Sequence, residues 1–222
     1  MRYRNYGLQF PIFLGYTLLH RYSFNDGTAS DSVGGSAYAG SLMAGATVTN
    51  NQASFTTSGP YVNLPSGLSA GYMALSVEAW VTTGVNTGWT RIYQFGTSAA
   101  SNTNSFGIFR QNGPNSFALM WQDVFSTWNT FTSSVQFDSQ TNVHVVVTAY
   151  AFGYASLYIN GILQGSIPVV SNPIPMSTIF YIGKSFDSTA GFIGSVNEFR
   201  IWGGALSATD IATRYSQGPG ET

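Results

Sequence analysis

Apolar and polar residues alternate along many short segments of the chain, as they do in half-buried β-strands. The alternation is regular in residues 75–81, where Leu, Val, Ala and Val fall on one face and Ser, Glu and Trp on the other. Further strands are predicted at 18–24, 46–49, 52–56, 61–64, 91–96, 105–110, 117–122, 142–148, 155–159, 162–164 and 179–183. Short strands between Gly, Pro and Asn turns predict an all-β fold, a two-sheet antiparallel jelly-roll β-sandwich.

Two local signals fix the end of the predicted topology. Asn160-Gly161 separates two apolar strands, and both residue types accept the positive φ of a type I′ hairpin turn. One short C-terminal helix is predicted from residue 205, because Ser207 is a favourable N-cap and Asp210 stands three residues later. This helix should make about two turns and end before Gly218.

Residues 191–202 contain the last predicted strand, and its two faces differ. Ile193, Phe199 and Ile201 share one face, and Glu198, Arg200 and Trp202 share the other. One interpretation is a core strand with an ordinary exposed polar face. The other is a closing strand that pairs with the N-terminal strand of the same domain.

Composition narrows the class of protein. The 222 residues are 44% hydrophobic, enough for one sizeable core, but only 8% are charged. The formal net charge is -1 and Lys184 is the only lysine. Without a basic stripe, nucleic-acid binding is not expected. The absence of cysteine excludes disulfides and thiolate metal sites.

Residues 1–17 are predicted to form an N-terminal arm. Arg2 and Arg4 precede an apolar stretch, as in a signal peptide, but Pro11 interrupts it and no cleavage site follows. The stretch is shorter than the roughly 20 apolar residues needed to span a bilayer, so no membrane span is expected. We expect the arm to contact its own sandwich (18–217) or a neighbouring subunit through self-association, with residues 218–222 as a tail.

Several segments together carry a family resemblance. They are residues 22–27 with Asp31, 75–81 (LSVEAWV), 144–148 (HVVVT), 158–161 (YING), 193–202 (IGSVNEFRIW) and 206–208. In this order they resemble laminin-G-like (pentraxin-type) domains of the concanavalin A-like lectin/glucanase superfamily. The resemblance implies the jelly-roll sandwich. It does not fix the function, because this superfamily includes lectins, adhesion modules, glycosidases and virion proteins.

The resemblance also implies a structural calcium ion near the joined chain ends. Carried over by position, its ligands would be Asp26 and Glu198, with Asp31 as a further candidate. Asn197 stands where the family commonly has Asp, which removes one charge. The residues themselves favour Asp26 and Asp31 as turn formers that bind nearby backbone N–H groups, with a calcium site as the alternative.

The acids do not form the pattern of a glycosidase. Retaining and inverting enzymes need two carboxylates about 5–5.5 Å or 6.5–9.5 Å apart, and no two acids here share a strand at alternate spacing. Glu78 and Glu198 could still meet across strands. His20 and His144 have no evident nucleophile beside them. We therefore expect no catalysis.

Aromatic and amide residues cluster in and beside predicted loops, as in a glycan-binding site. The candidate ligand-binding residues are Trp89, Trp121, Asp123, Phe125, Trp128 and Asn129. Aromatic rings offer flat faces to the C–H side of a sugar, and amides bind its hydroxyls. Residues 123–132 are the predicted recognition loop. The alternative is that these rings fill the core or an interface.

The sequence thus favours a non-catalytic, lectin-like recognition or adhesion module that binds a glycan or surface polysaccharide. Its expected location is extracellular, at a cell surface or at a virion surface. The alternative is a structural subunit of a virion or extracellular fibre, favoured by the arm and the low charge. A glycoside hydrolase is the third possibility.

Overall fold

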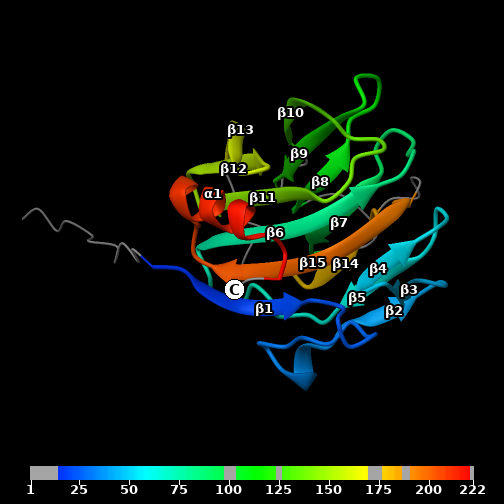
Figure 1. Cartoon of the computed structure of the whole chain (residues 1–222). Coiled ribbons are helices and arrows are strands. Elements are labelled where there is room, and N and C mark those ends of the chain that lie inside the picture. Colours follow the sequence, from blue (N-terminus) through cyan, green and yellow to red (C-terminus); the bar gives the residue numbers. More distant parts are fainter. Residues whose placement is uncertain (1–14, 98–103, 124–126, 170–176, 187–190, 221–222) are drawn as a thin grey trace, which may run out of the picture.

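Two antiparallel β-sheets lie face to face in the computed structural model, and one helix covers the outer side of the first sheet (Figure 1). The structure describes residues 15–97, 104–123, 127–169, 177–186 and 191–220. The prediction of an antiparallel jelly-roll sandwich with a short C-terminal helix is confirmed.

The first sheet, called sheet A, has eight strands among the described residues. Its order is β13 (Ile162–Pro168), β12 (Tyr154–Ile159), β11 (Val143–Tyr150), β6 (Ala74–Thr83), β15 (Gly194–Gly203), β4 (Gln52–Phe55) and β3 (Thr47–Thr49). The eighth, β1 (Thr17–Tyr22), also pairs with β15. The second sheet, sheet B, has seven strands in the same part of the chain. Its order is β10 (Trp128–Gln136), β9 (Ser116–Gln122), β8 (Ser105–Arg110), β7 (Arg91–Gly96), β14 (Ile179–Ile182), β5 (Tyr61–Leu64) and β2 (Ser41–Met43). A single 3₁₀ turn, η1 (Ser36–Tyr38), precedes β2.

The core between the sheets is rich in aromatic side chains. Phe95 of β7 packs edge-on against Phe106, Phe180 and Phe199, with ring centroids 5.3, 4.7 and 6.0 Å away. Phe199 belongs to sheet A and the other three rings to sheet B, so this group joins the two layers. Edge-to-face packing of this kind adds to the free energy of burial.

β15 is the closing strand proposed from the sequence. It pairs antiparallel with β1, so that Leu18 is opposite Trp202 and Tyr22 is opposite Phe199. On its other edge it pairs with β6. The pairing of the N-terminal strand with the last strand is confirmed.

The predicted turn and helix signals are also confirmed. Asn160 and Gly161 have φ angles of 50° and 78°, as a type I′ turn requires. Helix α1 (Ala208–Gln217) begins after Ser207, and Ser207 and Asp210 form a reciprocal capping box. The helix starts later than predicted and has ten residues, close to three turns.

The interpretation of an exposed polar face on the last strand is wrong. Glu198, Arg200 and Trp202 are all buried, because α1 packs over this face of sheet A (Figure 1). Ile211 of α1 joins Trp202 in a second apolar cluster with Val146 and Leu206.

Residues 123–132 are not one loop. β10 begins at Trp128 and pairs with β9 at the edge of sheet B. Four of its nine residues are Thr or Ser, so its alternation is weak in the sequence. The strand β2, of only three residues, was also not predicted.

Both ends of the described chain are attached to sheet A. β1 begins at Thr17, the last residue of the predicted arm. The carbonyl oxygens of Pro219 and Gly220, in the predicted tail, accept hydrogen bonds from Arg200 and Arg21 at 2.6 and 3.1 Å. Residues 1–14 lie outside the described part of the chain, so self-association through the arm stays a prediction. Within the described residues, no helix has the length and hydrophobicity to cross a membrane.

Candidate functional site

The loop between β6 and β7, residues 84–90, is held rigidly at one end of the sandwich. Asn86 is buried; its amide nitrogen donates to the carbonyls of Gly84 and Ile193 at 3.0 and 2.9 Å, and its amide oxygen accepts from the Ile193 N–H at 2.7 Å. Thr90 closes the loop by donating its hydroxyl to the carbonyl of Thr87 at 2.9 Å. The loop therefore presents its remaining side chains in a fixed geometry.

Trp89 is the exposed aromatic residue of this loop. Its backbone has a φ of 69°, in the left-handed region that a bulky residue rarely adopts. Its N–H donates to the Arg110 carbonyl at 2.8 Å, and its own carbonyl accepts from the Arg91 guanidinium. Such a conformation costs on the order of 1–3 kcal/mol and persists only where the surroundings enforce it.

The Trp89 ring lies flat on Phe109 of β8. The two ring planes differ by 10°, and their centroids are 5.4 Å apart. Phe109 is fully buried, and the Arg91 guanidinium lies 4.8 Å from its ring centroid. One face of the indole is thus packed, while 37% of the Trp89 residue remains exposed.

An ion pair fixes the neighbouring backbone. The Arg110 guanidinium donates to both carboxylate oxygens of Asp138 at 2.9–3.0 Å. Asp138 also accepts the Asn86 N–H at 3.1 Å. Because Arg110 carries the carbonyl that binds Trp89, this bidentate pair ties the platform to sheet B.

An exposed amide lies next to the platform. A β-carbon placed on Gly88 would be only 2.4 Å from Oδ1 of Asn112, so the Asn112 side chain packs directly against this glycine. Asn112 is exposed, and the glycine that it contacts directly precedes Trp89 in the sequence. Its amide offers both donors and an acceptor to a ligand on the ring.

Trp128 is the second exposed tryptophan on the outer face of sheet B. It is opposite Gln122 on β9, and residues directly opposite share a face. Phe109 is opposite Ala118, which is four residues before Gln122 on β9. An even spacing keeps both residues on the same face, and four residues of strand correspond to roughly 13 Å. Trp128 is 44% exposed. Both exposed indoles therefore belong to one surface.

The other predicted ligand residues are placed differently. Trp121 is fully buried and stacked on Phe106 at 4.9 Å, so it cannot offer a face to a ligand; this corrects the expectation for that residue. Asn129 is opposite Trp121 and so points away from the outer face. Asp123 is buried and accepts the Thr127 N–H at 2.9 Å, as a turn former. Phe125 lies outside the described residues.

The predicted calcium ligands bind protein donors instead. Asp26 accepts hydrogen bonds from the Thr28 N–H and hydroxyl and from the Ser30 hydroxyl, which lower the pKa of its carboxyl group. Asp26 is thus a turn former, one of the two alternatives left open above.

The carboxylate oxygens of Asp31 and Glu198 are also engaged by protein donors. Asp31 accepts three backbone N–H groups at 2.7–3.0 Å and lies 2.6 Å from Nδ1 of His20. Glu198 binds Arg21 at 2.7 Å and Arg200 at 3.1 Å. No group of three or more His, Cys, Asp or Glu in the described residues is arranged to hold a metal. This donor set does not fit a calcium ion, and calcium binding stays an untested prediction.

Glu78 and Glu198 do meet across strands, through one arginine. Arg200 donates to Glu78 at 3.2 Å and to Glu198 at 3.1 Å, and all three side chains are buried. Glu78 also accepts from Nε1 of Trp202 at 2.9 Å and lies 3.0 Å from Nε2 of His144. Because α1 covers this group, it lies in the interior and not in a cleft.

Sequence reasoning did not find Phe109, Arg110, Asp138 or Asn112 as parts of the platform. Their contacts with residues 84–90 bridge segments that are 20 or more positions apart. Nothing in the local sequence marks Trp89 as a residue with positive φ.

The comparisons with known proteins agree with this fold. Residues 55–212 match the sequence model of a family described as the concanavalin A-like lectin/glucanases superfamily. No curated protein sequence matches the chain. Domain 4 of AbnA, a GH43 extracellular arabinanase from Geobacillus stearothermophilus, solved in complex with arabinotriose, is similar in structure. Its TM-score is 0.71 at 21% identity, over 89% of this chain and 98% of that domain.

Receptor-binding domains of botulinum neurotoxins are similar as well. One is a structure of botulinum neurotoxin type C, a toxin whose cell entry is described as dependent on interaction with two ganglioside molecules. Its TM-score is 0.70 at 16% identity. A serotype D domain in complex with N-acetylneuraminic acid has a TM-score of 0.63 at 16% identity. Each match covers 90% of this chain, but this chain spans only about half of the toxin chain, 51% for type C and 50% for serotype D. At these identities the likeness shows the fold alone. Because the family match covers most of the sequence, the chain belongs to the concanavalin A-like lectin/glucanase superfamily.

Proposed function

We propose that this domain binds glycans without catalysis and that the exposed face of Trp89 is its stacking platform. The observation that carries the proposal is the strained and anchored Trp89, whose ring lies on Phe109 while 37% of the residue stays exposed. Strain of this kind is concentrated at functional sites.

The chemistry of the platform suits a sugar ring. The open indole face is apolar and flat, and it can cover the C–H side of a pyranose or furanose. Asn112, packed against Gly88, supplies amide donors and an acceptor for hydroxyl groups. Trp128, on the same outer face, would contact a longer chain at a second point.

The comparisons support the class of ligand by analogy. The arabinanase domain was solved with arabinotriose, and the type C toxin is described as depending on gangliosides. Those ligands belong to those proteins, because one fold hosts many functions. The same analogy supports a secreted or surface location, since AbnA is an extracellular enzyme.

The absence of catalysis is part of the proposal. The two acids that meet across strands, Glu78 and Glu198, are joined by Arg200 and are buried under α1. A glycosidase needs its two carboxylates on either side of an accessible glycosidic bond. Incubation with the bound glycans should therefore release no reducing ends.

The test is a glycan array with the wild-type domain, followed by calorimetry on each glycan that binds. Trp89→Ala should weaken binding at least tenfold, as loss of a stacking platform does. Phe152→Ala is the matched control. Phe152 is 73% exposed and follows Tyr150, which pairs with Ala74 at the opposite end of β6 from the 84–90 loop.

The outcomes are distinct. If Trp89→Ala binds as the wild type does, or if Phe152→Ala loses as much affinity, Trp89 is not the platform. If no glycan binds the wild-type domain, the proposed function itself is wrong. Trp128→Ala should weaken binding of longer oligosaccharides more than that of monosaccharides.

A further inference from the structure

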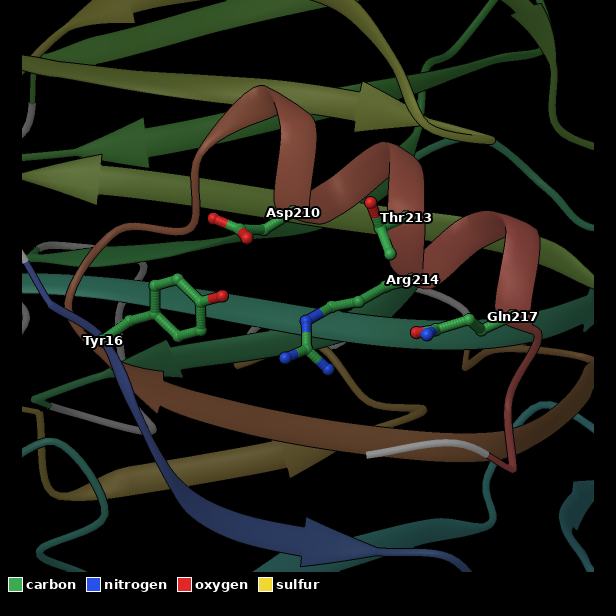
Figure 2. A pocket seen from close by; sticks show the side chains of 5 residues that line it. All are labelled: Tyr16, Asp210, Thr213, Arg214 and Gln217. Carbon is green, nitrogen blue, oxygen red and sulfur yellow. The ribbon is translucent and has the colours of Figure 1, made fainter.

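A second site lies on the opposite side of the molecule from Trp89, between α1 and the start of β1. It is a shallow pocket of about 220 Å³ lined by Tyr16, Asp210, Thr213, Arg214 and Gln217 (Figure 2). Four of these residues come from successive turns of α1. The fifth, Tyr16, directly precedes β1 and lies opposite them. The volume is below the roughly 300–1,000 Å³ of ordinary ligand pockets, so the pocket suits a single small group.

Arg214 is the charged centre of this pocket. Its guanidinium lies 3.9 Å from the centroid of the Trp202 ring and 5.9 Å from that of Tyr16. Tyr16 stands edge-on to Trp202, with ring planes at 84°. Figure 2 shows the guanidinium between Tyr16 and Gln217.

Arg214 differs from three other arginines of the described chain in having no carboxylate partner. Arg21, Arg110 and Arg200 each form an ion pair with a carboxylate. In the described ranges, no carboxylate lies within 4 Å of the Arg214 guanidinium, and its buried Nε has no hydrogen-bond partner. A planar guanidinium matches a carboxylate through two parallel hydrogen bonds.

Asp210, one turn before Arg214, restricts which anions fit. The hydrogen bond from the Ser207 hydroxyl, aided by Tyr16 and Arg214, lowers the pKa of Asp210, so it is ionised at neutral pH. Its charge would repel a doubly charged anion such as sulfate more strongly than a singly charged carboxylate. Hydroxyl groups beside a carboxylate bound at Arg214 can donate to Asp210 and bond Thr213 and Gln217.

We propose that this pocket binds one acidic sugar residue, with its carboxylate on Arg214 and its hydroxyls on Asp210, Thr213 and Gln217. The site is separate from the Trp89 platform and does not depend on it. The carboxylate could also come from the C-terminus of a peptide, which lacks the ring hydroxyls. The hydroxyl acceptor Asp210 is the reason to favour the sugar.

The test is an NMR titration of the ¹⁵N-labelled domain with three probes: D-glucuronate, D-glucose and acetate. Glucuronate should shift the Arg214 Nε–H signal and the Trp202 indole signal in a saturable way. Glucose lacks the carboxylate and acetate lacks the hydroxyls, so each should bind at least roughly tenfold more weakly. A C-terminal tripeptide with a free carboxylate is the fourth arm and should behave as acetate does.

Gln217→Glu is the decisive variant, because Gln217 is exposed and its replacement leaves the interior intact. The added carboxylate should weaken glucuronate binding roughly tenfold at low salt and less at high salt. Thr209→Ala, at an exposed position of α1 outside the pocket, is the control and should bind as the wild type does. Arg214→Lys keeps the charge but loses the paired hydrogen bonds, so it should also bind more weakly.

Four results would overturn the proposal, and the first three concern relative binding. They are equal binding of glucuronate and acetate, equal binding of glucuronate and glucose, and no effect of Gln217→Glu. Absence of any glucuronate shift at Arg214 would overturn it as well. Trp89→Ala should leave the Arg214 titration unchanged, so that failure at this pocket and failure at the Trp89 platform are told apart.

Discussion

Nε2 of His144 lies 3.0 Å from Oε1 of Glu78, on the neighbouring strands β11 and β6, and both side chains are fully inaccessible to solvent. The His144 ring is itself stacked on Trp80 at 4.7 Å, and Tyr215 of α1 stacks on Trp80 from the helix at 5.9 Å. The interior between sheet A and α1 therefore contains charged and aromatic groups beside the apolar cluster of Val146, Leu206 and Ile211. Its charges balance, because Glu78 and Glu198 are matched by Arg200 and Arg21.

Replacing Glu78 should destabilise the fold strongly. Glu78→Gln removes one of two acids that neutralise the buried Arg200, and loss of one member of a buried ion pair costs about 3–5 kcal/mol. Urea unfolding followed by tryptophan fluorescence measures the change. Asp26→Asn is the control, since Asp26 is exposed and binds only its own loop. A loss below about 1 kcal/mol for Glu78→Gln would contradict this account.

The same group makes stability depend on pH. Burial alone would raise the pKa of Glu78. The hydrogen bond from His144 and the charge of Arg200 together lower it by more than burial raises it, so the folded pKa lies below the ordinary value. A depressed pKa contributes stability above the unfolded pKa and loses it as pH falls through the folded pKa. Asp31 acts in the same direction.

The melting temperature should therefore be flat near neutral pH and fall below about pH 4. Scanning calorimetry from pH 7 to pH 2.5 measures this. In Glu78→Gln the fall should be shallower, because one of the contributing carboxylates is gone. An identical slope in wild type and variant would show that Glu78 does not contribute.

The support beneath Trp89 should affect glycan affinity without touching a ligand. Phe109→Leu keeps an apolar side chain but removes the flat face on which the indole lies. We expect binding to weaken several-fold, because the ring is no longer held in place before the ligand arrives. Phe180→Leu, the same change in the core between the sheets, is the control. Equal affinities of the two variants, measured by calorimetry, would show that the stacking on Phe109 is not needed.

Metal removal should leave the fold unchanged. The oxygens of Asp26, Asp31 and Glu198 accept hydrogen bonds from protein groups, so a calcium ion would have to displace them. We expect the same melting temperature in excess EDTA and in millimolar calcium. A rise of several degrees with calcium would restore the site that the family resemblance implies.

Most strands could be predicted from alternation, because their inner faces are continuous rows of apolar residues. β10 was missed because Thr and Ser fill its outer positions at the edge of the sheet. The burial of Glu198 and Arg200 could not be predicted either. A polar pair on a strand normally faces solvent, and only the docking of α1 reverses this.

The candidate site was predicted by residue type but not by arrangement. Trp89 and Trp128 are exposed, whereas Trp121 alternates inward because strand β9 continues through it; glycan binding by Trp89 and Trp128 stays a prediction. Trp89 is held in place by Phe109 and by the Arg110–Asp138 pair. The pairing of distant strands brings these residues to Trp89. No local pattern records such contacts.

The position of β15 has a consequence for how the chain folds. It follows the other strands of the described chain in sequence, yet it lies inside sheet A, between β6 on one edge and β1 and β4 on the other. Until residue 203 has left the ribosome, β1 and β4 have no strand to join to β6, and their edges stay unpaired. Contacts of such long sequence separation make folding slow. A ribosome-bound chain that stops before Gly194 should therefore be digested readily by protease, and one extended beyond helix α1 should resist it.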